Sequence, residues 1–232
     1  MSKPRPLIGL VAVSLLLAGG LSGCGVAGTD FHPGVAAEVG DDTVSVSEVD
    51  STASSYCSAI EGQLQGDNQV LPMRYLRGGI AGQLALLSAA QQFAEEKGVD
   101  AGRQYDQKVA ELESAVASLP EDQQDAVITI ESSSTYISGV EQAVGEQVLR
   151  DQGVRKAQAS DALAAGQQAF SQWLDDQDVS IDPQFGVEIK NAQAVPTDTS
   201  VSYALGDTAT KANADSPDQA YAGSLPDSHR CG

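Results

Sequence analysis

The chain has 232 residues, and its 32 Asp and Glu residues against 13 Lys and Arg give a net charge of −19 at pH 7. Proteins that bind nucleic acid carry clustered Lys and Arg to displace counterions from the phosphates, so this balance argues against a nucleic-acid partner. It also argues against adhesion to anionic lipid through side-chain charge, and it favours a soluble body that repels acidic surfaces.

The N-terminus has the features of a secretory signal. Two basic residues precede the apolar stretch Leu7–Leu21, which is shorter than the roughly 20 apolar residues of a membrane-spanning helix. The motif Leu21-Ser22-Gly23-Cys24 resembles a bacterial lipobox, in which the peptide is cut before the Cys and the Cys sulfur receives diacylglycerol. We therefore expect residues 1–23 to be a lipoprotein signal peptide. Lipid on Cys24, with an acyl chain such as palmitate on its amino group, would anchor the protein to the cell membrane outside the cytoplasm. An ordinary secretory signal is the alternative.

Two short strands are predicted after this N-terminal region. Residues 24–34 are small and Gly-rich, which indicates a flexible tether. Val35–Val39 and Thr43–Val46 alternate apolar and polar residues around the turn Gly40-Asp41-Asp42, a pattern typical of a β-hairpin. An isolated hairpin is only marginally stable in water, so we expect this one to dock on another part of the chain.

Apolar residues at spacings of three and four then predict a helical body. We expect helices from an N-cap at Ser47 to about Leu64, from Pro72 to about Lys97, from Gly102 to Leu119, from Pro120 to about Arg150, and from about Gln158 to Asp176. Glycines at 78, 79 and 82 in the second helix either allow a close contact or break the helix. The run Ser132–Thr135 interrupts or bends the fourth helix in this interpretation.

The chain changes character after the last predicted helix. Residues 178–186 are extended and turn-like, because Val179 and Ile181 alternate with polar residues and Pro183 blocks a helix. From Val187 onward large apolar residues are few, so residues 187–232 are predicted to be a mostly disordered tail. The predicted ordered body, residues 35–186, has the size of one domain.

Two cysteines follow the expected lipidation site, Cys57 in the first predicted helix and Cys231 near the C-terminus. An exported protein meets an oxidising or thiol-poor environment, so a Cys57–Cys231 disulfide is the default expectation. Two free thiols and an intermolecular bridge are the alternatives. His229 stands two residues before Cys231, but a lone His-x-Cys is a weak signal, and we expect no metal site.

Motifs of catalysis are absent from the sequence of the predicted body. The two histidines, His32 and His229, fall in the tether and the tail, so the commonest general base is missing from residues 35–186. There is no phosphate-binding loop, nucleophile elbow or dinucleotide-binding motif in the sequence. Adjacent carboxylates are expected by chance in so acidic a chain. We therefore expect a protein that binds, without enzymatic activity and without a cofactor.

Three segments resemble the SurA-like chaperone domain. "VAAEVGDDTVSVSEVD" (35–50) is similar to the strand pair that opens this domain, and "MRYLRGGIAGQLALLSAAQQFAEEKGV" (73–99) is similar to its long helix. "WLDDQDVSIDPQFG" (173–186) resembles the closing helix and strand, with Gln184 and Phe185 in place of the usual Arg and Tyr.

The resemblance implies a fold and a function. In the family the opening hairpin pairs with the terminal strand, so Val179–Ile181 is the expected partner of the hairpin. The implied fold is mainly α, a bundle of about five helices with a small β-hairpin joined by a C-terminal strand. Many relatives carry a parvulin prolyl-isomerase domain before the last helix. In this chain that place holds only residues 151–161, so the resemblance implies the chaperone part without isomerase activity.

The expected function is a membrane-anchored holdase for unfolded or exported polypeptides. The residues we assign to polypeptide binding are apolar side chains of the long helix and its neighbour: Tyr75, Leu76, Ile80 and Tyr105. For each of them, packing in the core is an alternative and commoner role. The alternative function is a structural or adaptor lipoprotein that docks one cell-envelope protein.

Overall fold

The structure is a computed structural model that describes residues 33–197, 206–212 and 218–232. These residues belong to one compact unit that runs from His32 to Gly232. The predicted signal peptide, the predicted lipidation site Cys24 and most of the predicted tether lie outside the described residues.

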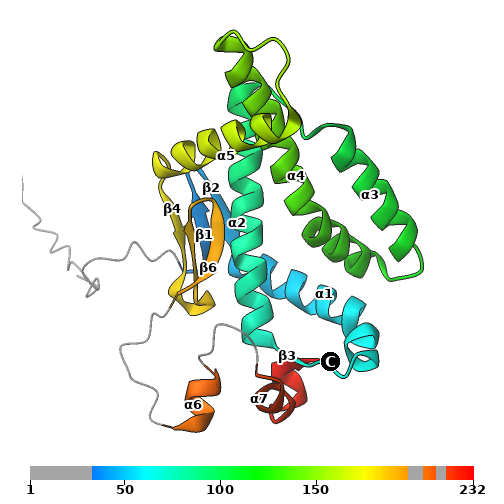
Figure 1. Ribbon diagram of the computed structural model, residues 1–232. Helices are drawn as coiled ribbons and strands as arrows, with labels where there is room; N and C mark the ends of the chain where they lie inside the picture. The colour runs from blue at the N-terminus through cyan, green and yellow to red at the C-terminus, as the bar shows by residue number, and fades with distance from the viewer. Residues whose placement is uncertain (1–32, 198–205, 213–217) are drawn as a thin grey trace, which may run out of the picture. The chain divides into compact units, whose positions relative to one another are not determined.

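Five long helices form the body, as predicted: α1 (Val46–Gly66), α2 (Met73–Lys97), α3 (Gly102–Val116), α4 (Glu121–Asp151) and α5 (Ala159–Asp175). Figure 1 shows α2 at the centre, with the small sheet on one side and α4 on the other. The first helix begins earlier than predicted, because the side chain of Ser45, not Ser47, accepts the hydrogen bond of the Glu48 amide at 3.1 Å. Helix α2 follows Pro72 and ends at Gly98, whose left-handed φ of 62° favours glycine.

A three-stranded antiparallel sheet confirms the predicted docking of the hairpin. The strand β1 (Val35–Val39) lies between β2 (Asp42–Ser45) and β4 (Val179–Ile181). Ala37 is paired with Ile181, and Val39 with Val179. The Asp182 amide also donates a hydrogen bond to the Ala36 carbonyl at 2.8 Å. The two ends of the helical body are therefore joined through β1.

Helix α2 continues through its glycines, and a second hairpin with the turn before it packs on two of them, Gly78 and Gly82. This hairpin consists of β5 (Val187–Lys190) and β6 (Gln193–Pro196), and it follows the short 3-10 helix η1 (Pro183–Phe185). A methyl group at Gly78 would lie 2.5 Å from the Phe185 carbonyl oxygen, and one at Gly82 would lie 2.5 Å from the Ala194 Cβ. Gly79 faces open space. The glycines thus permit close contact and do not break the helix.

The serine run does not interrupt α4. The hydroxyl of its buried residue Ser133 forms hydrogen bonds at the contact between α2 and α4. Ser133 is buried and donates a hydrogen bond to the Ile130 carbonyl at 2.9 Å. The Gln83 amide of α2 donates to the same carbonyl at 2.7 Å and also bonds to the Ser133 hydroxyl. A buried hydroxyl with partners is compatible with a continuous helix.

The core is mostly aliphatic, with one aromatic group on α2 and α5. The rings of Phe93 and Phe170 have centroids 5.2 Å apart, and Phe93 and Trp173 are 5.5 Å apart. A second, smaller apolar cluster joins α3 and α4 and contains Leu112, Val116 and Val127, against which α1 places Tyr56. The helix pair α3–α4 is therefore connected to α1 through a small apolar cluster of its own.

Helices α4 and α5 cross with their backbones in contact. A side chain at Gly145 of α4 would overlap the Ala162 carbonyl of α5, and one at Gly166 of α5 would overlap the Glu141 carbonyl of α4. The Glu141 side chain is 5% exposed in this crossing. Burial raises the pKa of its carboxyl group to about 7, against the opposing effect of a hydrogen bond with Gln167.

Ordered elements continue past Gly186, the predicted end of the domain. Besides β5 and β6, the structure describes α6 (Asp207–Ala212), α7 (Gln219–Gly223), the 3-10 helix η2 (Asp227–His229) and β7 (Arg230–Cys231). Val187 and Ile189 pack against the main core, which holds the second hairpin in place. Residues 198–205 and 213–217 of the predicted tail lie outside the described residues.

Candidate polypeptide-binding surface

The four side chains predicted to bind polypeptide do not form one surface. Tyr75 is 46% exposed, and Leu76, next to it, packs partly against the core. Ile80 is only 2% exposed, so its assignment to a binding surface is replaced by a role in the core. Tyr105 is partly buried and packs edge-on against Tyr136 of α4 at 5.1 Å between ring centroids. Of the four, Tyr75 is exposed, Leu76 and Tyr105 are partly exposed, and Ile80 is buried.

Tyr75 lies in the first turn of α2, beside a sharp reversal of the chain that we call the α1–α2 corner (residues 64–76). The Gln69 amide donates to the Leu64 carbonyl at 2.8 Å, and Asn68 takes a left-handed φ of 52°. An isolated Asn tolerates this conformation better than most residues. The reversal leads into β3 (Leu71–Pro72), a short strand that directly precedes α2.

The C-terminal segment, residues 218–232, covers the α1–α2 corner (Figure 1, in red). Its strand β7 pairs antiparallel with β3, placing Cys231 opposite Leu71 and Arg230 opposite Pro72. The Val70 amide donates to the side-chain oxygen of Gln219 at 2.9 Å. The segment therefore satisfies main-chain groups of the corner.

A disulfide links the C-terminal segment to α1. Cys57 and Cys231 are bonded, with their Cα atoms 5.7 Å apart. The Cys231 side chain is 1% exposed, whereas Cys57 is half-buried. The bond thus joins two residues separated by 174 positions and fixes the end of the chain against the corner.

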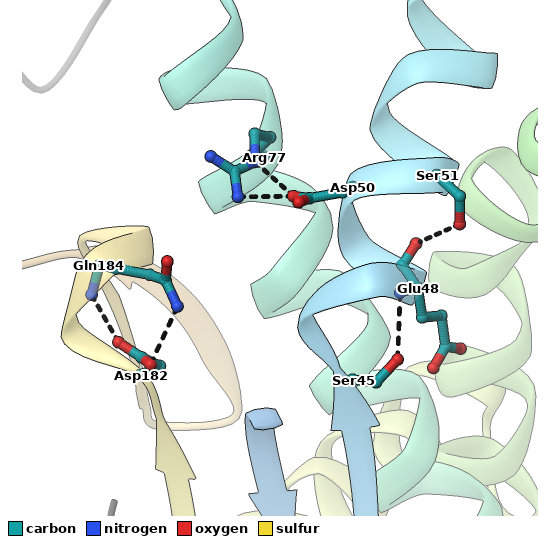
Figure 2. A network of polar contacts seen from close by, with 7 residues as sticks. All are labelled: Ser45, Glu48, Asp50, Ser51, Arg77, Asp182 and Gln184. Carbon is teal, nitrogen blue, oxygen red and sulfur yellow. Dashed lines mark hydrogen bonds and ion pairs between the residues drawn. The ribbon is translucent and has the colours of Figure 1, made fainter. Parts of the chain in front are cut away.

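An ion pair between α1 and α2 lies close to this surface, two residues beyond Tyr75 on α2. Figure 2 shows Arg77 of α2 and Asp50 of α1 pointing toward each other, with the Arg77 Nη2 atom 2.5 Å from the Asp50 carboxylate. The Arg77 guanidinium also lies over the Phe185 ring, 5.5 Å from its centroid. Asp182 orders the turn before Phe185 by accepting hydrogen bonds from the amide and the side chain of Gln184, both at 2.9 Å. Because the ion pair is partly exposed, we expect it to contribute little to the unfolding free energy and to act mainly by orienting α1 and α2 relative to each other.

Polar contacts also connect α1 to α4. The Tyr56 hydroxyl donates a hydrogen bond to the Glu131 carboxylate, and the Ser55 hydroxyl donates to Asp122 at 2.7 Å. Burial, followed by the effect of Glu131, raises the pKa of the Tyr56 hydroxyl. These contacts fix α1, and with it Cys57, to the rest of the bundle.

Sequence reasoning did not find the residues that line the corner from the C-terminal side, namely Gln219, Ala222 and Arg230. Ala222 is completely buried, although it stands in a segment poor in large apolar residues. The signal that leads to them is Cys231, because a disulfide to α1 brings the preceding residues to the same place. Main-chain pairing, the interaction that β3 makes with β7, is one by which proteins recognise extended peptides.

Two searches of the described ranges found nothing. No group of three or more His, Cys, Asp or Glu residues there is arranged to hold a metal ion. None of the helices in these ranges has the length and apolar character needed to cross a membrane.

Comparison with known proteins gives no match: no family model, no curated protein and no solved structure is significantly similar to the chain. The resemblance to the SurA-like domain therefore rests on the sequence segments quoted above, and the function is argued from the geometry of the fold.

Proposed function

We propose that this protein is a lipid-anchored, extracytoplasmic holdase that binds unfolded or exported polypeptides by contact alone and has no prolyl-isomerase activity. The observation that carries the proposal is the sheet order β2–β1–β4. It joins the front hairpin to Val179–Ile181 around a helical body, which is the arrangement that the SurA resemblance implies.

Two further features support the proposed location. The lipobox-like sequence ending at Cys24 supports attachment to the membrane through lipid. The pairing of Cys57 with Cys231 supports an environment outside the cytoplasm, because disulfides persist where thiols are not kept reduced.

The surface properties of the described body support polypeptide binding in particular. Tyr75 is the largest exposed apolar side chain in the described residues, and aromatic side chains contribute strongly to contacts with protein partners. It stands beside β3, which pairs with the strand β7 through main-chain groups, a kind of contact that is independent of the partner's sequence. The net charge of −19 keeps copies of the protein apart while they hold apolar segments.

The proposal is tested by suppression of aggregation. Residues 32–232, which form one compact unit, are mixed at equal concentration with several unrelated proteins that aggregate on reduction or heating, and light scattering is followed. A holdase suppresses aggregation of all of them. A Tyr75→Ser variant should suppress it less, and Val154→Ser, which changes the other large exposed apolar residue of the described chain, should behave as the wild type. Absence of suppression, together with capture of a single stoichiometric partner, would instead favour the adaptor function.

A further inference from the structure

The C-terminal segment occupies the α1–α2 corner in the manner of a bound peptide. Its strand β7 extends the edge of β3 by antiparallel pairing, which is how many domains bind an extended peptide. Successive side chains of β7 have different surroundings, as in such complexes. Cys231 is buried at 1% exposure, while the Arg230 guanidinium turns back to Asp227 of its own segment at 2.6 Å.

The fit of the segment is close at both of its ends. Gln219 accepts a hydrogen bond from the Val70 amide, and Ala222 is fully buried. At the other end, a side chain at Gly232 would lie 2.5 Å from the Gln69 carbonyl oxygen. The corner therefore accommodates the short helix α7 at one end of the segment and the extended pair Arg230–Cys231 at the other, with small side chains at the buried positions.

In the described residues, the Cys57–Cys231 disulfide is the one covalent cross-link between the segment and the corner, in addition to the main chain that joins the segment to the body at its other end. A ligand that is tethered beside its own site has a high effective concentration, of the order of millimolar for a flexible link and higher for a direct bond. A free peptide with similar contacts does not compete effectively while the disulfide is intact.

We propose that residues 218–232 are a self-ligand latched by the Cys57–Cys231 disulfide, and that the α1–α2 corner binds an extended segment of another polypeptide when this disulfide is reduced. The inference rests on the proposed polypeptide-binding function and names its site and its control. Release exposes the β3 edge next to Tyr75, so that main-chain pairing and an exposed aromatic side chain become available together.

The release step requires a dithiol reductant. One thiolate of the dithiol attacks a sulfur of the Cys57–Cys231 bond, which breaks and leaves a mixed disulfide. The second thiolate of the reductant then displaces the protein sulfur. Two electrons and two protons pass to Cys57 and Cys231, which become thiols, and the reductant becomes an intramolecular disulfide.

The test compares four samples of residues 32–232: the oxidised wild type, the wild type reduced with dithiothreitol, the double variant C57S/C231S, and the oxidised control G145A. A methyl group at Gly145 would overlap the Ala162 carbonyl, so we expect this control to loosen the crossing of α4 and α5 without a change at the corner. Circular dichroism establishes which samples are folded, and the reduced wild type keeps the test decisive if the double variant does not fold. The probes are a fluorescent peptide with the sequence of residues 218–232 carrying C231S, and reduced, carboxymethylated α-lactalbumin as an unfolded client.

The expected result is that both unlatched samples bind the peptide and the client at least about tenfold more tightly than the oxidised wild type, while G145A does not. Hydrogen exchange at the Val70 and Leu71 amides should become faster on unlatching and slow again when the peptide is added. Equal binding by latched and unlatched protein, or an equal gain in G145A, would overturn the self-ligand and leave the holdase proposal standing. Binding of the peptide without binding of any client would support the self-ligand site and refute the holdase proposal.

Discussion

The buried carboxyl group of Glu141 makes the stability of the protein depend on pH. Burial in the α4–α5 crossing raises its pKa from the ordinary value of 4.5 to about 7. As the pH rises, the carboxyl ionises first in the unfolded chain, so the unfolded state is stabilised relative to the folded one. The difference between 7 and 4.5 corresponds to about 3 kcal/mol of unfolding free energy. This contribution is present in full below about pH 4.5 and is lost as the pH rises through about 7.

The substitution Glu141→Gln isolates this effect because it keeps the size of the side chain and removes its ionisation. Relative to the wild type, the variant should gain up to about 3 kcal/mol of unfolding free energy between about pH 4 and about pH 8. Urea unfolding can be followed by the fluorescence of Trp173, the single Trp of the chain. Glu146→Gln, in an exposed part of the same helix, controls for the loss of one negative charge. If the wild type and Glu141→Gln show the same pH dependence, the carboxyl is not desolvated and the close crossing is wrong.

Three more predictions concern the packing of the second hairpin, the turn of that hairpin and lipidation at Cys24. Gly78→Ala should lower the unfolding free energy by about 1–3 kcal/mol, because its methyl group meets the Phe185 carbonyl, whereas Gly79→Ala should raise it by about 1 kcal/mol; equal shifts in thermal unfolding would contradict the packing of the second hairpin on α2. Ala192→Gly should raise the melting temperature, because Ala192 has a left-handed φ of 58° that costs an alanine about 1 kcal/mol; a lower melting temperature argues against this turn. Cys24→Ala should abolish incorporation of labelled palmitate in cells and move the protein from the membrane to the soluble fraction; label retained by the variant would exclude Cys24 as the lipidation site.

The main helices and the pairing of β1 with β4 could be predicted from the sequence because their signals are local or come from the quoted motifs. The N-cap was misplaced by two residues, since Ser45 and Ser47 are equally suitable caps and lie together, with their hydroxyls 3.0 Å apart. The serine run of α4 gave a false sign of a break, because the buried Ser133 hydroxyl bonds to Gln83 of α2, a contact that only the tertiary structure supplies.

The second hairpin gave too weak a signal to be predicted. Its turn contains Asn191 and Ala192, both at positive φ, where the pattern that identifies such turns has a glycine. Its docking depends on the space left by Gly78 and Gly82, and a sequence pattern does not indicate what fills that space. Without this tertiary contact, residues 187–197 resemble the rest of the polar C-terminal region.

The exposure of the candidate side chains was predicted only in part, because one helix stripe serves both the core and the surface. Leu76 and Ile80 are four residues apart and share a face of α2, while Tyr75 is rotated by about 100° from Leu76. The neighbours of α2 decide which of these directions is buried, and they cover Ile80 and leave Tyr75 exposed. Tyr105 is covered in part by the edge contact with Tyr136 of the adjacent helix.

Photo-crosslinking tests the central claim, that unfolded polypeptides bind beside Tyr75, most directly. Benzoyl-phenylalanine is placed at Tyr75 and, as the matched control, at Val154, the two large apolar residues that are exposed in the described chain. The samples are irradiated with several unrelated unfolded proteins after reduction of the disulfide. If unfolded polypeptides bind beside Tyr75, crosslinks to all of these proteins form from position 75 and none from position 154. No crosslink from position 75, or equal yields from both positions, would contradict it.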